Sequence, residues 1–100
     1  MHGVNMSTIN EVRQEIRLID SEIMQLIHKR VGMAAKVLEA KKKEAININD
    51  PSQNTVVLDR AADAAVELNL DVSAVKEIFK ILITMNIERQ QELSGEGNLP

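Results

Sequence analysis

Hydrophobic residues in the first part of the chain recur at steps of three and four, which predicts one long amphipathic helix from about Ile9 to about Glu44. The recurring positions are Ile9, Val12, Ile16, Ile19, Ile23, Leu26, Met33, Val37 and Ala40. They follow a heptad repeat that is interrupted at one position only, where Arg30 places a charge. Thr8 followed by Glu11 has the pattern of a capping box and marks the start of the helix.

Two shorter helices are predicted after a loop over residues 45–52, in which asparagine, aspartate and proline interrupt the helical pattern. The second helix runs from about Gln53 to about Leu68. One of its faces consists of Val57, Ala61, Ala64 and Leu68, and this alanine-rich face allows close approach to a neighbour. The third helix runs from about Val72 to about Leu93 and follows Asp71, a good N-cap residue. Its apolar stripe is Val75, Ile78, Phe79, Leu82 and Ile83, and it continues into Asn86 and Gln90.

The length of the first helix predicts a dimer. A helix of about 36 residues is about 54 Å long, whereas a compact domain of about 100 residues has a radius of gyration of about 13 Å. The rest of one chain cannot cover such a rod, so we expect two copies to pair along it in an intertwined homodimer. The predicted fold is all-α, with three helices per chain in one domain over residues 9–93. Residues 1–8 are expected to be a flexible segment and residues 94–100 a disordered tail.

The composition narrows the possible functions. The 100-residue chain has a formal net charge of −3 and one aromatic residue, Phe79, so neither charge nor base stacking favours nucleic-acid binding. It has no cysteine for a disulfide or a thiolate nucleophile, and its two histidines, His2 and His28, have no metal-ligand spacing. No apolar run is long enough to span a membrane and the start lacks a signal-peptide pattern. We therefore expect a cytoplasmic protein that uses no metal and no cofactor.

Polar residues on helix faces that should be apolar are the candidate functional residues, because a buried charge needs a partner or a ligand. Arg30 and Lys41 are eleven residues apart, which on a straight helix returns to within about 20° of the same face, about 16 Å further along. With Ala34 and Val37 between them, they would form a cradle for a compact anion. Two alternatives stay open: Arg30 pairs with a carboxylate across the dimer, or Lys41 belongs to the solvated run Lys41–Lys43.

Four further positions are candidates with alternatives of their own. Asn86 and Gln90, one helical turn apart, either pair with the backbone and with each other or line the same pocket as the two cations. Asp50 either caps the second helix or accepts a hydrogen bond from a ligand hydroxyl. Arg13 lies about 25 Å from Arg30 along the helix, so unless the helix breaks it cannot share a pocket with Arg30 of its own chain. In an antiparallel or crossed dimer it could enter the pocket of the partner chain. Taken by itself, Arg13 is typical of a surface residue.

These residues resemble the all-helical chorismate mutases of the AroQ class, over about residues 9–93. The matching positions are Val12-Arg13, Ile19-Asp20, Leu26-Ile27, Lys29-Arg30, Ala34, Val37, Ala40-Lys41, Ile48-Asn49-Asp50-Pro51, Leu58, Arg60, Leu68-Asn69-Leu70-Asp71, Ile78-Phe79 and Gln90. The most specific part of the resemblance is the ordered set of Arg13, Arg30, Lys41, Asp50 and Gln90.

The resemblance implies an enzyme that rearranges chorismate to prephenate in aromatic amino-acid biosynthesis. It also implies three helices per chain and an intertwined dimer with two equivalent active sites. Arg30 resembles the arginine that binds a substrate carboxylate, and Arg13 resembles the arginine that the other subunit donates to a carboxylate. Lys41 and Gln90 resemble the catalytic pair that hydrogen-bonds the ether oxygen.

The resemblance is weaker at the start of the second helix. Asp50 resembles a residue near the ring hydroxyl, and Asn86 stands where the family often has a small polar residue that touches a carboxylate. The family usually carries an Arg-Glu pair three and four residues after the position of Asp50, where this chain has Gln53 and Asn54. A charge-assisted hydrogen bond contributes about 1.5–3 kcal/mol against about 1 kcal/mol for a neutral one. We therefore expect weaker substrate binding, or a different but related substrate.

The implied reaction is a concerted shift that requires no nucleophile, acid or cofactor. Arginine side chains would hold the dianion in its reactive conformer, and a Lys–Gln pair would stabilise charge that develops on the ether oxygen. Three other functions stay open: a related pyruvate-lyase activity on isochorismate, a non-catalytic regulatory module on this fold, and a structural helical dimer in which Arg30 pairs with an acidic residue.

Overall fold

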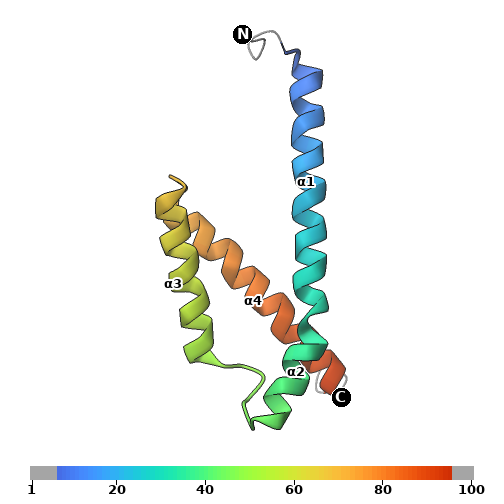
Figure 1. Cartoon of the computed structure of the whole chain (residues 1–100), viewed down its shortest axis with the longest axis vertical. Coiled ribbons are helices and arrows are strands. Elements are labelled where there is room, and N and C mark those ends of the chain that lie inside the picture. Colours follow the sequence, from blue (N-terminus) through green and yellow to red (C-terminus); the bar gives the residue numbers. More distant parts are fainter. Residues whose placement is uncertain (1–6, 96–100) are drawn as a thin grey trace.

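The computed structural model describes residues 7–95, which form four α-helices and no β-strand. The helices are α1 (Ile9–Gly32), α2 (Ala34–Lys43), α3 (Pro51–Glu67) and α4 (Val72–Ser94). Figure 1 shows α1 and α2 as a long rod that bends near one end, where α4 crosses it, with α3 packed beside α4. The all-α prediction is confirmed. The expectations for residues 1–6 and 96–100 fall outside the described residues.

The predicted first helix is interrupted at Met33, so the expectation of one unbroken helix to Glu44 is wrong. The Met33 N–H donates to the carbonyl oxygen of Arg30 at 3.2 Å, three residues back, whereas an α-helix uses the residue four back. Met33 itself keeps a right-handed helical conformation, with φ −75° and ψ −11°. Therefore α1 and α2 are two segments of one bent helix, and the three-helix architecture is retained.

Two features account for the bend. Gly32 directly precedes it, and glycine inside a helix costs about 1 kcal/mol relative to alanine. In addition, the side-chain Nδ2 of Asn86 in α4 donates to the carbonyl oxygen of Arg30 at 3.1 Å. A side chain that inserts into the backbone hydrogen-bond ladder is a known cause of sharp helix kinks. The hydrophobic periodicity of the sequence could not predict this contact, because it joins residues that are far apart along the chain.

The predicted helix caps are confirmed. Thr8 and Glu11 form a reciprocal capping box at the start of α1. The Asp71 carboxylate accepts from the Ala74 N–H at 2.8 Å at the start of α4. The Asp50 carboxylate caps α3, which therefore begins at Pro51, two residues earlier than predicted. Proline suits the first helical position because its missing N–H would have no partner there.

A left-handed residue, Ala45 with φ 55°, ends α2 and turns the chain back on itself. The Ile46 N–H donates to the carbonyl oxygen of Lys41 at 2.8 Å, in the manner of a Schellman motif. The loop that follows carries the carbonyl oxygen of Ile48 to the Lys41 ammonium. The turn thus holds the side chain of Lys41 as well as the end of the helix.

The buried core of the single chain is small. Its buried apolar residues are Ala34, Leu38, Val57, Ala61 and Ala65. The predicted apolar face of α3 is buried in the single chain at Val57 and Ala61, whereas Ala64 is exposed and Leu68 is 68% exposed. The face of α3 that meets α4 follows steps of four residues, from Val57 to Ala61 to Ala65. The alanine-rich sequence does not distinguish Ala64 from Ala65.

Helix α1 contributes no buried residue, although its apolar stripe is long. Ile16, Ile19 and Ile23 are each about half exposed. The radius of gyration is 18.1 Å, well above the value of about 13 Å for a compact chain of this size. This exposed apolar face of α1 is the surface along which the two chains of the predicted dimer would pair. None of the helices in residues 7–95 combines the length and apolar character needed to cross a bilayer.

Candidate active site

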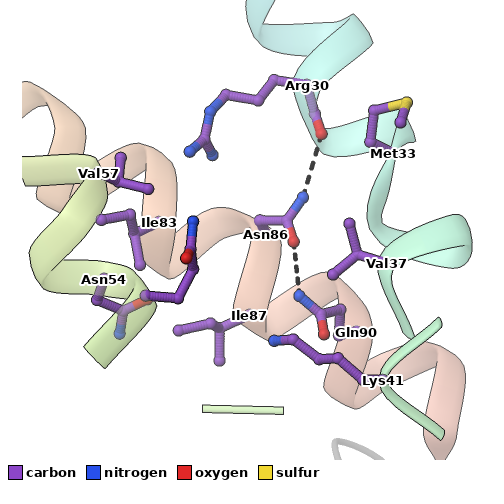
Figure 2. A pocket seen from close by; sticks show the side chains of 11 residues that line it. Arg30, Met33, Val37, Lys41, Asn54, Val57, Ile83, Asn86, Ile87 and Gln90 are labelled. Carbon is purple, nitrogen blue, oxygen red and sulfur yellow. Dashed lines mark hydrogen bonds between the residues drawn. The ribbon is translucent and has the colours of Figure 1, made fainter. Parts of the chain in front are cut away.

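A cavity of about 320 Å³ lies beside the bend at Met33 and is bounded by the rod, α3 and α4. Six of the sequence-predicted site residues line it, and Figure 2 shows five of these, all but Gln53, by label around the cavity. They are Arg30, Lys41, Gln53, Asn54, Asn86 and Gln90. Arg13 and Asp50, the other two, are not among the lining residues.

Arg30 reaches the cavity from the last turn of α1. Its Nη1 donates to the backbone carbonyl oxygen of Leu82 at 2.9 Å. The salt bridges within residues 7–95 both lie on α4, between Lys80 and Glu77 and between Arg89 and Glu92. Arg30 is therefore not paired with a described carboxylate of its own chain.

The surroundings of Arg30 disfavour its charge. Partial burial lowers the pKa of the guanidinium, and the nearby Arg60 lowers it further. An incoming anion would relieve both effects, because it would offset the lost hydration and the repulsion between the two cations. Arg60 is one of the positions that match the AroQ class, but the sequence gave no indication that its charge lowers the pKa of Arg30.

Lys41 is a pocket residue rather than one member of a solvated run. Its Nζ donates to the carbonyl oxygen of Ile48, and it is partly buried, whereas Lys42 and Lys43 are exposed. Burial lowers the pKa of Lys41, and the charge of Asp50 partly opposes this shift. Asp50 thus lies close enough to influence the Lys41 ammonium electrostatically, although it does not line the cavity.

The two amides of α4 are hydrogen-bonded to one another. Gln90 Nε2 donates to Asn86 Oδ1 at 2.6 Å, and Asn86 Nδ2 donates to the carbonyl oxygen of Arg30 at 3.1 Å. Both sequence-based alternatives hold, because the two residues pair with each other and with the backbone and also line the cavity. Gln90 is 2% exposed, and its Oε1 is buried with no partner among the described residues. A buried oxygen without a donor costs about 1–3 kcal/mol.

The first turn of α3 forms another wall of the cavity. Asn54 Nδ2 donates to Asn49 Oδ1 at 3.1 Å, which holds the Asn54 side chain against the preceding loop. The Asp50 carboxylate accepts from the Gln53 N–H at 3.3 Å and from Ser52 Oγ at 3.1 Å. The capping role of Asp50 is confirmed, and its contact with a ligand stays a prediction.

Arg13 lies in the first turns of α1, whereas the cavity is lined by Arg30 in the last turn, and Arg13 is exposed. It is seventeen residues from Arg30, which corresponds to about 25 Å along the helix. The structure of one chain therefore does not bring Arg13 to the cavity, and its donation by a partner chain stays a prediction.

Sequence reasoning missed the apolar walls of the cavity. They are formed by Met33, Val37, Val57, Ile83 and Ile87. The sequence places four of these residues on apolar helix faces, all except Ile87. It connects only Val37 with a binding site. The signal for Ile87 was present, because Ile83, Asn86, Ile87 and Gln90 follow the spacing of one helix face. The polar pair and the apolar pair of α4 thus face the same cavity.

The chemistry that these residues offer is binding and charge stabilisation. The ionisable lining residues are two cations, Arg30 and Lys41, and the other polar lining residues are amides. The described lining residues include no carboxylate to act as a general base and no thiol or hydroxyl to act as a nucleophile. The arrangement suits a compact anion with apolar parts and hydrogen-bonding oxygens.

Two curated proteins with related names are similar to this chain. The chain is 27% identical over 81 residues to a bifunctional chorismate mutase/prephenate dehydratase of Buchnera aphidicola subsp. Schizaphis graminum, which covers 81% of this chain and 21% of that protein. It is 22% identical over 76 residues to a 4-amino-4-deoxychorismate mutase of Streptomyces venezuelae, which covers 76% of this chain and 74% of the relative. The chain thus spans about a fifth of the first relative and about three quarters of the second. No solved structure matches the chain significantly.

The family comparison extends over all four helices. The model of the family described as chorismate mutase type II matches residues 12–91, which includes every residue that lines the cavity. Since this match covers most of the chain, the protein belongs to the chorismate mutase type II family.

Proposed function

We propose that this protein is a chorismate mutase, which converts chorismate to prephenate by an intramolecular rearrangement. The observation that carries the proposal is the cavity in which Arg30 and Lys41, neither paired with a described carboxylate, meet the buried amide of Gln90. Membership of the family supports it, as do the names of the two relatives. Residues 9–93 would form the catalytic domain.

Arg30 is proposed to bind one carboxylate of the substrate. A guanidinium presents several N–H groups in a plane, which fits the two oxygens of a carboxylate. Among the described residues, the acceptor for the Arg30 guanidinium is the carbonyl oxygen of Leu82, which binds Nη1, so other N–H groups remain for a ligand. Gln53 and Asn54 are proposed to bind the substrate from the opposite wall, and Asp50 to lie near the ring hydroxyl.

Lys41 and Gln90 are proposed to donate hydrogen bonds to the ether oxygen of the substrate. Negative charge develops on this oxygen as its bond to carbon breaks, so donors fixed in advance stabilise the transition state more than the ground state. The partial burial of Lys41 strengthens such an interaction, because water screens it less. The bond rearrangement needs no proton transfer, in keeping with the absence of a carboxylate among the described lining residues.

The proposed active form is an intertwined homodimer in which α1 of each chain covers α1 of the other. The exposed apolar stripe of α1 supports this arrangement, because such a surface is unfavourable in water. In the dimer, Arg13 of one chain would bind the second carboxylate of the substrate held by the other chain.

The direct test of the function is the spectrophotometric consumption of chorismate by the purified protein, with isochorismate as a second substrate. Consumption of chorismate with formation of prephenate is expected. Cleavage of isochorismate with release of pyruvate, and no action on chorismate, would identify a lyase instead. Binding of chorismate without turnover would identify a regulatory module. Either result would overturn the proposal.

Hybrid dimers test the donation of Arg13. Arg13→Ala and Lys41→Ala proteins, each inactive alone, are mixed and allowed to exchange chains. A hybrid dimer has one site with both defects and one intact site, so about a quarter of the wild-type sites should be recovered at equal mixing. Mixing of two Lys41→Ala preparations is the control. If hybrids form without recovery of activity, Arg13 does not act across the dimer.

A further inference from the structure

A chain of hydrogen bonds connects the bend in the first helix to Gln90. The carbonyl oxygen of Arg30 accepts from Asn86 Nδ2 at 3.1 Å, and Asn86 Oδ1 accepts from Gln90 Nε2 at 2.6 Å. The dashed lines in Figure 2 follow these two bonds along one wall of the cavity. Asn86 thus links the backbone of the rod to the Gln90 amide.

The direction of this chain is fixed at the end formed by Arg30. A backbone carbonyl oxygen can only accept a hydrogen bond, so Asn86 has to turn its NH₂ group toward it. The oxygen of Asn86 then faces Gln90 and can only accept, so Gln90 has to present its own NH₂ group. Reversal of either amide would bring two oxygens or two NH₂ groups together.

Each member of the chain is held in place. Arg30 lies in the last turn of α1 at the bend, where the Met33 N–H donates to the same carbonyl oxygen. Gln90 is 2% exposed, so its side chain has little room to rotate. One hydrogen of Gln90 Nε2 is used by Asn86, and the second is left for a ligand in the cavity that Gln90 lines.

We propose that Asn86 is a positioning residue that fixes the orientation of the Gln90 amide and so presents one N–H of Gln90 to the substrate. This inference rests on the proposed function. It differs from the expectation that Asn86 itself touches a carboxylate, because both polar atoms of Asn86 are already bonded within the protein. Asn86 therefore acts on the reaction through Gln90.

A double-mutant cycle tests the proposal with Asn86→Leu, Gln90→Met and the double variant. Asn86→Leu should lower kcat about tenfold, the loss of about one hydrogen bond, with KM changed less than about twofold. In the Gln90→Met background the same substitution should change kcat less than about twofold, because the group it positions is gone. Losses that multiply in the double variant, or a loss confined to KM, would overturn the positioning role.

Two further variants distinguish the loss of positioning from a loss of folding. Asn86→Ser is too short to span both partners and adds no apolar bulk, so it should behave as Asn86→Leu does even if the leucine variant folds poorly. Thr84→Val lies on the exposed side of the same helix and should keep kcat within about twofold of the wild type. An Asn86→Ser protein with wild-type kcat would overturn the proposal.

Hydrogen exchange of the Gln90 side-chain NH₂, followed by ¹H–¹⁵N spectroscopy without substrate, gives a readout besides activity. The Gln90→Met protein identifies the signal by its loss. Exchange should be at least about tenfold faster in Asn86→Ser than in the wild type, because the bond to Asn86 protects the group. Equal protection in both proteins would refute the positioning role. A wild-type protein that fails to consume chorismate would refute the proposed function instead.

Discussion

The guanidinium of Arg30 in α1 donates from Nη1 to the backbone carbonyl oxygen of Leu82 in α4, across 2.9 Å. This bond fixes the cation at the edge of the cavity without neutralising it, because a carbonyl group carries no net charge. Burial and the proximity of Arg60 both lower the pKa of Arg30, so the folded chain bears a cost for keeping this charge. A half-buried cation without a carboxylate partner is expected where a ligand supplies the opposite charge.

Arg30→Met is therefore expected to stabilise the protein and to weaken substrate binding. Methionine fills similar space without a desolvated charge, so Tm should rise by a few degrees. Loss of one charge-assisted contact of about 1.5–3 kcal/mol should raise KM about 10- to 150-fold. Thermal unfolding and steady-state kinetics measure the two effects. Arg17→Met, at an exposed position of α1, is the control, and a clear fall in Tm for Arg30→Met would show that Arg30 is structural.

Lys41→Ala is expected to lower kcat far more than it raises KM. Removal of one donor to an oxygen that gains charge in the transition state lowers kcat about 10²- to 10³-fold in comparable sites. Lys42→Ala, which alters the neighbouring exposed lysine, should leave both constants nearly unchanged. A rise in KM alone for Lys41→Ala would mean that the ammonium binds substrate and transition state equally.

Activity is expected to fall at high pH with an apparent pKa below the ordinary lysine value. The reason is that burial lowers the pKa of Lys41, and only the ammonium form is a charged donor. The free energy of unfolding changes with pH in the opposite direction to activity. The reason is that, in this pH range, the unfolded chain binds more protons than the folded one. The contribution of Lys41 to the free energy of unfolding therefore rises with pH. The pH profile of kcat/KM, which reports the free enzyme, measures the first effect.

The Asp50→Asn variant provides a sharper form of this pH test. Asparagine is as good an N-cap as aspartate, so α3 should keep its start, but the charge that partly offsets the shift of Lys41 is lost. The alkaline limb of kcat/KM should move to lower pH. A limb that moves to higher pH, or disappears, would show that Lys41 is not the group that titrates.

Gln53→Arg is expected to strengthen substrate binding. Gln53 lines the cavity at the first turn of α3, where the resemblance to the AroQ class leads us to expect an arginine. Exchange of a neutral hydrogen bond for a charge-assisted one should lower KM about 2- to 30-fold. Gln25→Arg adds the same charge on the exposed surface of α1 and serves as the matched control. An unchanged KM for Gln53→Arg, with wild-type folding, would mean that this position does not contact the substrate.

The sequence predicted those parts of the fold that depend on neighbours along the chain. The caps at Thr8 and Asp71 and the three helical regions follow from local hydrogen bonding and periodicity. The break at Met33 was not predicted, because it depends on the Asn86 side chain, which lies more than fifty residues further along. The choice of Ala65 over Ala64 as the buried residue depends equally on how α3 meets α4.

For the candidate site, the sequence predicted most of the polar residues but not the hydrogen bonds among them. Arg30, Lys41, Asn86 and Gln90 stood out as polar residues on apolar faces, and the structure places them around one cavity. The bonding order within this group was not predictable, because it depends on which backbone oxygen is open at the bend. The electrostatic influence of Arg60 on Arg30 likewise arises only when α3 and the rod both pack against α4.

The uncovered stripe of α1 has a kinetic consequence. Most of the stability of a helix in a protein comes from packing of its apolar face, and α1 has no fully buried residue in its own chain. If two chains cover each other's apolar stripe on α1, then α1 folds in the same kinetic step in which the two chains associate. The rate at which refolding chains become active should then grow with the square of their concentration. Strong dilution should melt α1 and separate the chains together.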